Sequence, residues 1–259
     1  MSSLKVAAKK RFGQNFLVDK TILYKIIEAM PNSEHKIVEI GPGLGDLTRY
    51  LVDVKSVEAF EVDTDLCKHI KESFKDELEL GRLRLHCGDV LDCWSSSLID
   101  ESYDLVANLP YYIATNIILR ALKDDNCSSL LVMVQREVAQ KFSASPGDRD
   151  FGSLSIIAQS VAEAKIVTIV PPSAFDPEPK VDSAVLFLDK HRSRADDDFE
   201  AMLRVAFAQP RKTLVKNLSA HYTRSVITTT LNECGYVATV RPHQVSTQDY
   251  HRLYLSLRK

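Results

Sequence analysis

Short apolar runs alternate along the first half of the chain with segments whose apolar residues recur every three or four positions. The runs predict β-strands and the longer periodicity predicts helices, as Leu66, Ile70 and Phe74 illustrate. Strands that alternate with helices indicate an α/β fold with a parallel, doubly wound sheet, whose ligands bind at the carboxyl ends of the strands. We predict strands at residues 37–40, 57–62, 83–87, 103–107 and 130–134, and helices at residues 115–122 and 137–142.

The second half of the chain changes character. Residues 165–170 and 181–188 are again rich in β-forming residues, and we expect them to complete the sheet as an antiparallel edge around the loop at residues 171–179. From residue 196 the apolar pattern is helical with no clear strand. The sequence therefore predicts two domains, a catalytic one at residues 1–190, whose first 20 residues are basic, and a small α-helical one at residues 196–259.

Composition limits the class of protein. The chain has 259 residues, of which 45% are hydrophobic and 26% charged, as is ordinary for a soluble globular protein. The run at residues 130–134 is the longest aliphatic one and is far too short to span a bilayer, so we expect a cytoplasmic protein. The five cysteines never form a C-x-x-C pair, and we expect reduced, packed thiols with no zinc site and no disulfide framework.

Charge is distributed unevenly behind a net value of -2. Residues 1–20 hold five basic residues against one acid, and residues 203–226 hold five basic residues and no acid. A polyanion that touches both segments would explain this arrangement, whereas a pair of solvated helix faces is the alternative. The candidate contacts are Lys9, Lys10, Arg11, Arg211, Lys212 and Lys216.

The tetrapeptide Asn108-Leu109-Pro110-Tyr111 follows directly on the predicted strand at residues 103–107. The amine of adenine is a poor nucleophile, since its lone pair is delocalised, so a methyl donor requires that nitrogen to be held and polarised. The side chain of Asn108 and the peptide carbonyl of Leu109 offer two acceptors for this purpose. Pro110 makes the turn rigid, and Tyr111 offers a ring for stacking. A plain turn after a buried strand is the alternative.

A glycine-rich loop, Gly41-Pro42-Gly43-Leu44-Gly45, follows the first predicted strand. Glycines let the backbone approach a ligand closely. Glu61 lies twenty residues past Gly41, a spacing at which an acid binds a ribose hydroxyl in nucleotide-binding units. An NAD site is therefore one interpretation of this loop.

The glycine spacing nevertheless differs from G-x-G-x-x-G, and Glu39 stands two residues before the first glycine. An acid at that position suits a ligand that carries an ammonium group, as S-adenosylmethionine does. Asp89, after the third strand, could accept from the donor's adenine amine. The alternatives are a surface ion pair for Glu61 and a turn or N-cap role for Asp89. We favour S-adenosylmethionine, held by Glu39, Gly41, Gly43, Glu61 and Asp89.

Separated motifs in this order resemble those of the ribosomal RNA adenine N6,N6-dimethyltransferases, and most closely the bacterial small-subunit (KsgA-type) enzymes. The resemblance covers essentially the whole chain. The motifs are KRFGQNFL at residues 10–17, EIGPGLG at 39–45, NLPY at 108–111, PPSAF and PKVDSAV within 171–185, and FAQPRKTL at 207–214.

The resemblance implies a Rossmann-like, S-adenosylmethionine-dependent methyltransferase domain followed by a helical RNA-binding domain. It also implies dimethylation of two adjacent adenosines near the 3′ end of small-subunit RNA during ribosome assembly. Tyr111 and Phe175 are the candidates to sandwich the target base, although a Phe in a proline-rich loop could equally be a hydrophobic plug. Pro210 stands where the family usually carries a further basic residue. By position, the donor site would be lined by Asn15, Leu17, Gly41, Glu61, Asp89 and Asn108.

We therefore expect a monomeric enzyme that needs no metal and acts on the immature small ribosomal subunit. Two other interpretations stay open. One is an adenine methyltransferase of the same fold that modifies large-subunit RNA or DNA. The other is a non-catalytic nucleic-acid-binding or assembly protein, against which the intact motif at residues 108–111 argues.

Overall fold

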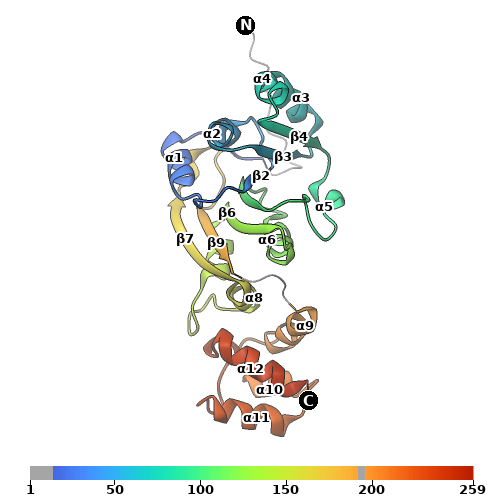
Figure 1. The fold of residues 1–259 in the computed structure, drawn as a ribbon. Coiled ribbons are helices and arrows are strands. Elements are labelled where there is room, and N and C mark those ends of the chain that lie inside the picture. Colours follow the sequence, from blue (N-terminus) through green and yellow to red (C-terminus); the bar gives the residue numbers. More distant parts are fainter. Residues whose placement is uncertain (1–13, 192–195, 259) are drawn as a thin grey trace. The chain divides into compact units, whose positions relative to one another are not determined.

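In a computed structural model of the protein, the described residues are 14–191 and 196–258, and they form two compact units (Figure 1). The first unit extends to Ala139 and resumes at Lys165. The second contains Gln140–Ala164 together with the C-terminal helices. Each unit has its own buried core, and each is considered by itself.

A seven-stranded sheet forms the centre of the first unit, in the order β4-β3-β2-β5-β6-β9-β7. The pairs β4–β3, β3–β2, β2–β5 and β5–β6 are parallel, and β9 is antiparallel to β6. The predicted parallel sheet with an antiparallel edge is confirmed. The strands are β2 (Lys36–Ile40), β3 (Val57–Glu61), β4 (Leu83–Cys87), β5 (Tyr103–Asn108), β6 (Cys127–Gln135), β7 (Ala162–Val170) and β9 (Ser183–Lys190).

The order of these strands fixes where a ligand can bind. The chain runs outward from β2 through β3 to β4 and then returns to β5, on the other side of β2. In doubly wound sheets such a reversal leaves a crevice at the carboxyl ends of the two neighbouring strands. The crevice lies here between the glycine loop after β2 and the Asn108 motif after β5.

Helices connect the strands of this unit, and those after β3 and β4 begin at an aspartate that stands two residues after the end of the strand. The side chain of Asp63 accepts a hydrogen bond from the Asp65 amide, and that of Asp89 accepts one from the Leu91 amide, so each is an N-cap. The helices are α1 (Lys20–Glu28), α2 (Asp46–Val54), α3 (Thr64–Ser73), α4 (Lys75–Glu79), α5 (Val90–Cys93), α6 (Ala114–Lys123) and α7 (Arg136–Ser143).

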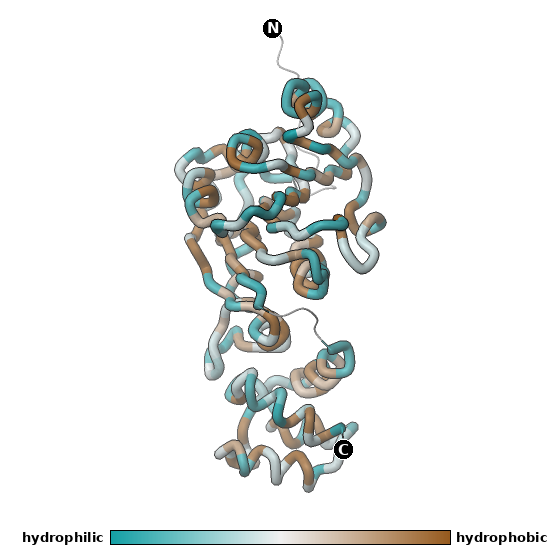
Figure 2. Tube along the Cα trace, viewed as in Figure 1, coloured by the Kyte–Doolittle hydropathy of each residue, from teal (hydrophilic) through white to brown (hydrophobic). Residues whose placement is uncertain are grey.

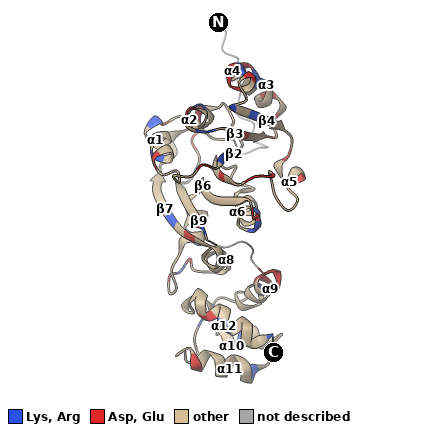
Figure 3. Cartoon of the chain, viewed as in Figure 1, with Lys and Arg blue, Asp and Glu red and all other residues tan. Residues whose placement is uncertain are grey.

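The central strands of the sheet are buried and largely apolar, whereas β4 and β7 are partly exposed. Hydrophobic stretches follow the central strands (Figure 2), and β6 contains no charged residue (Figure 3). Ile37, Val106 and Leu131 are at most 1% exposed in one continuous cluster. A buried strand reads as a largely apolar run, which is why β2, β5 and β6 were recognisable in the sequence although Glu39 interrupts β2 and Asp104 interrupts β5.

A two-stranded antiparallel pair was not predicted. It joins β1 (Phe16–Leu17) to β8 (Phe175–Asp176), with Leu17 opposite Phe175, and a 3₁₀ turn at Pro172–Ala174 precedes β8. The amides of Val18 and Asp19 both donate to the carbonyl of Ala174. Two segments about 160 residues apart in the sequence are thus held side by side.

The second unit is helical in its described part. Helix α8 shares it with the C-terminal helices, since Ser160 hydrogen-bonds to His251 and Thr247 donates to Gln159. Residues 140–164 therefore pack with a unit that the sequence led us to begin at residue 196. The helices are α8 (Ser153–Val161), α9 (Asp197–Ala206), α10 (Leu214–Leu218), α11 (Arg224–Glu233) and α12 (Thr247–Leu257), with a 3₁₀ turn at Pro242–Gln244.

No helix within the described ranges is both long and apolar enough to cross a membrane.

Candidate functional site

A pocket opens at the carboxyl ends of β2, β3, β4 and β5, within the first unit. The structure thus brings together strand ends that are up to 68 residues apart in the sequence, from Ile40 to Asn108. It is lined by residues 14–17, 39–44, 60–62, 88–90 and 108–113, and by Asp46, Leu47 and Leu66. Every residue predicted to bind the donor lies in this lining.

The glycine loop shapes one wall of the pocket. Gly43 has a φ of 61°, in the left-handed region that favours glycine, and a Cβ there would lie 3.2 Å from the ring of Phe16. Gly45 is also left-handed, and a Cβ there would collide with the ring of Phe74, which follows the last residue of α3. The loop therefore serves two purposes, since Gly43 lines the pocket and Gly45 lets α2 pack against α3.

Two carboxyl groups from β2 and β3 are buried beside this loop. Glu39 is 1% exposed, and its Oε2 accepts a hydrogen bond of 2.7 Å from the hydroxyl of Thr48. Burial raises the pKa of Glu39 to about 8, against the opposing effect of the Thr48 hydrogen bond. The carboxyl group is therefore largely protonated at neutral pH, and a cation in the pocket would favour its ionised form.

Glu61 is 4% exposed and already has partners in the protein. Its Oε2 accepts from the Gly43 amide at 3.2 Å, and its Oε1 accepts from the Asp63 amide at 2.8 Å. Burial raises the pKa of Glu61, and these two backbone hydrogen bonds act in the opposite direction. The predicted alternative of a surface ion pair is wrong, because the side chain is buried and bonds to the backbone.

Asp89 differs from both glutamates because it is exposed. Its Oδ1 accepts from the Leu91 amide at 2.9 Å, so the predicted N-cap role is confirmed. The same residue lines the pocket, and a carboxylate has room for further donors. Capping α5 and binding a ligand are therefore compatible in this residue.

The Asn108 motif forms the wall opposite the glycine loop. The Asn108 side-chain Nδ2 donates to the carbonyl of Asn15 at 3.1 Å, which leaves its Oδ1 as the atom able to accept from a ligand. Leu109 is buried and its amide donates to the Met133 carbonyl. The hydroxyl of Tyr111 lies 2.6 Å from the hydroxyl of Ser183 at the start of β9, and this bond fixes the ring.

Phe175 is a predicted base-stacking residue that the structure does not bring to the pocket. Its side chain is 3% exposed, and it belongs to the main hydrophobic cluster with Leu17 and Ala174. The β1–β8 pair holds it there. This packing favours the alternative of a hydrophobic plug.

Tyr112 is a pocket residue that our sequence reasoning missed. It is 60% exposed and lines the pocket next to Tyr111. Partial burial raises the pKa of its hydroxyl, and the negative charges of Asp89 and Glu61 add to the effect. The second aromatic residue after the proline was the available signal, and its closeness to two carboxylates became visible only in the fold.

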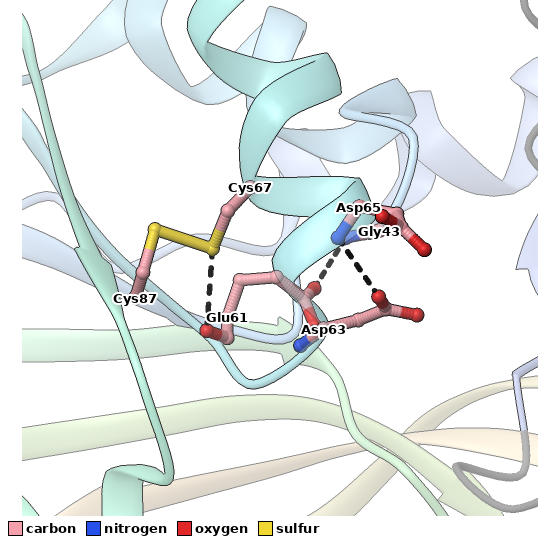
Figure 4. Close-up of a disulfide and its surroundings, with 6 residues drawn as sticks. All are labelled: Gly43, Glu61, Asp63, Asp65, Cys67 and Cys87. Carbon is pink, nitrogen blue, oxygen red and sulfur yellow. Dashed lines mark hydrogen bonds between the residues drawn. A yellow bond between two sulfur atoms is a disulfide. The ribbon is translucent and has the colours of Figure 1, made fainter.

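A disulfide joins Cys67 and Cys87 beside the pocket (Figure 4). Our expectation of five reduced thiols is therefore wrong for this pair, whereas Cys93, Cys127 and Cys234 are free. Parallel pairing of β3 with β4 sets Cys87 opposite Glu61, and the first turn of α3 brings Cys67 back over the same strand ends. That proximity is a product of register, which cysteine spacing does not reveal.

The predicted RNA-binding residues divide into two groups. Lys9, Lys10 and Arg11 lie outside the described residues. Arg211, Lys212 and Lys216 are exposed at the start of α10, in the second unit. Thr213, between them, caps α10 by accepting from the Lys216 amide.

The chain resembles known proteins over nearly its whole length. Residues 5–259 match the model of the family described as "Ribosomal RNA adenine dimethylase". A protein of Sulfurimonas denitrificans named "Ribosomal RNA small subunit methyltransferase A" is 65% identical over 96% of this chain and 94% of its own length. The protein of that name from Campylobacter jejuni strain RM1221 is 43% identical over 98% of this chain and 96% of its own length.

Two solved structures share the fold. The 23S rRNA methyltransferase ErmE has a TM-score of 0.74 and 25% identity, covering 95% of this chain and 100% of its own. A dimethyladenosine transferase from Plasmodium falciparum has a TM-score of 0.78 and 24% identity, covering 94% and 97%. The family model over residues 5–259 and the 65% identical relative show that the chain belongs to the ribosomal RNA adenine dimethylase family.

Proposed function

We propose that this protein transfers methyl groups from S-adenosylmethionine to N6 of two adjacent adenosines near the 3′ end of small-subunit ribosomal RNA. The product would be N6,N6-dimethyladenosine, formed in the cytoplasm on an immature small subunit by a monomeric enzyme. The observation that carries the proposal is the 65% identity to a small-subunit methyltransferase. A relative named for 23S rRNA reaches only 25% identity, which argues against the large-subunit alternative.

The residues that line the pocket supply a charge and hydrogen-bond acceptors that suit S-adenosylmethionine. Glu39 is a buried carboxyl group in the pocket lining, and it gains a counter-charge if an ammonium group lies next to it. Glu61 and Asp89 offer acceptors for ribose hydroxyls and for an adenine amine, while Gly41 and Gly43 allow close approach of the backbone. Asn15 and Leu17 complete the lining on the side of β1. S-adenosylmethionine supplies an electrophilic methyl group on a sulfonium.

The acceptor end of the pocket would hold the target amine. Asn108 Oδ1 and the Leu109 carbonyl would accept the two N6 hydrogens and direct the nitrogen lone pair into the pocket. Both acceptors also favour the positive charge that develops on this nitrogen in the transition state. Pro110 keeps the turn rigid, and the ring of Tyr111, held by Ser183, offers a face for the base. Such a site works by alignment and exclusion of water rather than by a strong base.

RNA contacts would come from the basic residues. Arg211, Lys212 and Lys216 present an exposed positive cluster, and Lys9, Lys10 and Arg11 supply another in the sequence. Phosphate contacts make binding depend on salt. Replacing Arg211 and Lys212 together should therefore reduce the salt dependence of particle binding by up to about two phosphate equivalents.

The decisive experiment locates the methyl groups. Immature small subunits, large subunits and DNA are incubated separately with the protein and methyl-labelled S-adenosylmethionine, and nuclease fragments are analysed by mass spectrometry. We expect label only in small-subunit RNA, at two neighbouring adenosines that each gain two methyl groups. Label confined to large-subunit RNA or DNA contradicts the substrate, and donor binding without transfer to any of them supports the non-catalytic alternative.

A further inference from the structure

The disulfide lies where an oxidant can reach one of its sulfurs. Cys87 ends β4 and is exposed, whereas Cys67, in the first turn of α3, is 4% exposed. Their Cα atoms are 6.2 Å apart, within the range that a disulfide spans. One cysteine is thus accessible and the other is a buried partner at bonding distance, as in reversible thiol pairs.

The same disulfide lies directly beside the donor pocket, since Leu66 and Gly88, the chain neighbours of its two cysteines, line that pocket. Cys87 pairs with Glu61 in the parallel ladder, and the Gly88 amide donates to the Glu61 carbonyl at 2.8 Å. The sulfur of Cys67 lies 3.5 Å from that carbonyl oxygen (Figure 4). A disulfide sulfur carries no hydrogen, so this contact becomes a hydrogen bond only when Cys67 is a thiol.

The segment after Cys87 is held to β3 by the Gly88–Glu61 hydrogen bond, and its residues up to Asp89 are exposed. Gly88 has a φ of 154°, and the space where its Cβ would stand is open to 4 Å. Asp89 is exposed and is bonded through its cap of α5, a helix of four residues. The covalent link to α3 therefore adds to the ladder pair and the Gly88–Glu61 hydrogen bond in fixing the position of Asp89 relative to Glu61.

We propose that Cys67 and Cys87 form a reversible redox modification site that sets the affinity for the methyl donor. The inference rests on the proposed donor site. Hydrogen peroxide would convert the Cys87 thiolate to a sulfenic acid with release of hydroxide, and the Cys67 thiol would then displace water to form the disulfide. A dithiol reductant returns both thiols and is itself oxidised to a disulfide. Each turn of the cycle is a two-electron exchange at these two sulfurs.

The direction of the effect follows from preorganisation. With the disulfide closed, Asp89 and Glu61 stand at the pocket before the donor arrives, and the donor does not have to order the Gly88–Asp89 segment. With the thiols free, the donor has to order this segment when it binds, and the free-energy cost of that ordering makes binding weaker. We expect the reduced protein to bind S-adenosylmethionine roughly threefold to tenfold more weakly, as for one or two immobilised groups.

The test compares four proteins, each after peroxide and after dithiothreitol: the parent, Cys67→Ser, Cys87→Ser and Cys93→Ser. Cys93 is a free, exposed cysteine nearby and is the matched control. Peptide mapping by mass spectrometry identifies the linked pair, and calorimetry gives the Kd for S-adenosylmethionine. We expect the parent and Cys93→Ser to form a Cys67–Cys87 link and to bind more weakly once reduced. Cys87→Ser should match the reduced parent and ignore the oxidant. Cys67→Ser should match the reduced parent after dithiothreitol and form no link after peroxide, which leaves Cys87 as a sulfenic acid.

Two results would overturn the inference: absence of a Cys67–Cys87 peptide from the oxidised parent, or equal Kd values for its linked and reduced forms. Failure of both forms to bind S-adenosylmethionine would contradict the proposed function, and the dependent inference with it. If Cys93→Ser changed the Kd as much as Cys87→Ser, the change in donor affinity would not be specific to the Cys67–Cys87 pair. That result would also overturn the inference.

Discussion

The predicted site residues occupy two regions that differ in what surrounds them. In the buried region, formed by β2, β3 and β8, Glu39, Glu61 and Phe175 are each less than 5% exposed. In the open region, formed by the ends of β4 and β5, Asp89 is exposed and Asn108 is half-buried. Buried groups must find partners inside the protein, so they contribute to stability as well as to binding. Groups in the open region retain hydrogen-bonding capacity for a ligand.

The largest expected effect is a difference between Tyr111 and Phe175, which we predicted from the sequence to stack together on the target base. Phe175→Ala should lower the free energy of unfolding by about 3–5 kcal/mol, because it empties a packed site in the core. Tyr111→Ala, at a half-buried position, should mainly slow turnover, with a loss of about 1–3 kcal/mol from base stacking. Denaturant unfolding and single-turnover rates, measured for both variants, test the distinction. A Phe175→Ala protein that is as stable as the parent but slow would restore Phe175 to the base site.

Asn108 gives the sharpest test of the open region. Asn108→Ala should raise the barrier to methyl transfer by about 2–4 kcal/mol, as expected for loss of one positioned acceptor. The Kd for S-adenosylmethionine should change little, because the main partner of Asn108 Oδ1 is the target amine. Single-turnover rates on immature small subunits and calorimetry with the donor measure the two quantities. A rate within threefold of the parent's would exclude Asn108 from the chemical step.

Much of this site was predictable because the ends of the strands can be located from the sequence. Apolar runs located β2 to β5, and the polar residue after each run had to lie at one edge of a parallel sheet. The burial of Phe175 was not predictable, since it depends on pairing with Leu17, far away along the chain. The Cys67–Cys87 link depends in the same way on the register of β3 against β4. The hydrophobic pattern of a sequence indicates local structure, whereas the burial of Phe175 and the Cys67–Cys87 link depend on pairing between distant segments.

Glu61 in the buried region and Asp89 in the open region are the two donor-site acids to compare. Replacing either should weaken donor binding to a similar degree, but the two replacements should differ in their effect on stability. Glu61→Ala and Asp89→Ala should each weaken S-adenosylmethionine binding by about 1–3 kcal/mol. Only Glu61→Ala leaves the buried amide of Asp63 and the half-buried amide of Gly43 without their acceptor. It should therefore lose more stability than Asp89→Ala, which loses an N-cap worth about 1 kcal/mol.

Asp89→Asn is the control for that comparison, because an asparagine keeps the cap but removes the charge. Calorimetry with the donor alone and chemical denaturation are the measurements. Unchanged affinity in both alanine variants, or binding of NADH by the parent, would reject the cofactor site as assigned.

The smallest expected effect comes from Glu39 and has a defined dependence on pH. Its pKa of about 8 in the folded protein exceeds the ordinary value of 4.5, so between these values the folded state holds a proton that the unfolded chain has lost. Stability from this group therefore falls as the pH rises through that window. Glu39→Gln keeps an acceptor for Thr48 but cannot ionise. Between pH 7 and pH 8 the parent should lose about 1 kcal/mol of unfolding free energy relative to this variant.

Glu39→Gln should also weaken donor binding, because a neutral amide provides no counter-charge for an ammonium group. In the parent, binding should release a fraction of a proton near pH 7, since a nearby cation lowers the pKa of Glu39. Calorimetry in buffers of different ionisation enthalpy measures that release, and the variant should show less of it. Equal proton release by parent and variant, together with parallel stability curves from pH 7 to 8, would mean that Glu39 is already ionised in the folded protein. The buried region would then carry a permanent charge and would differ from the open region in exposure alone.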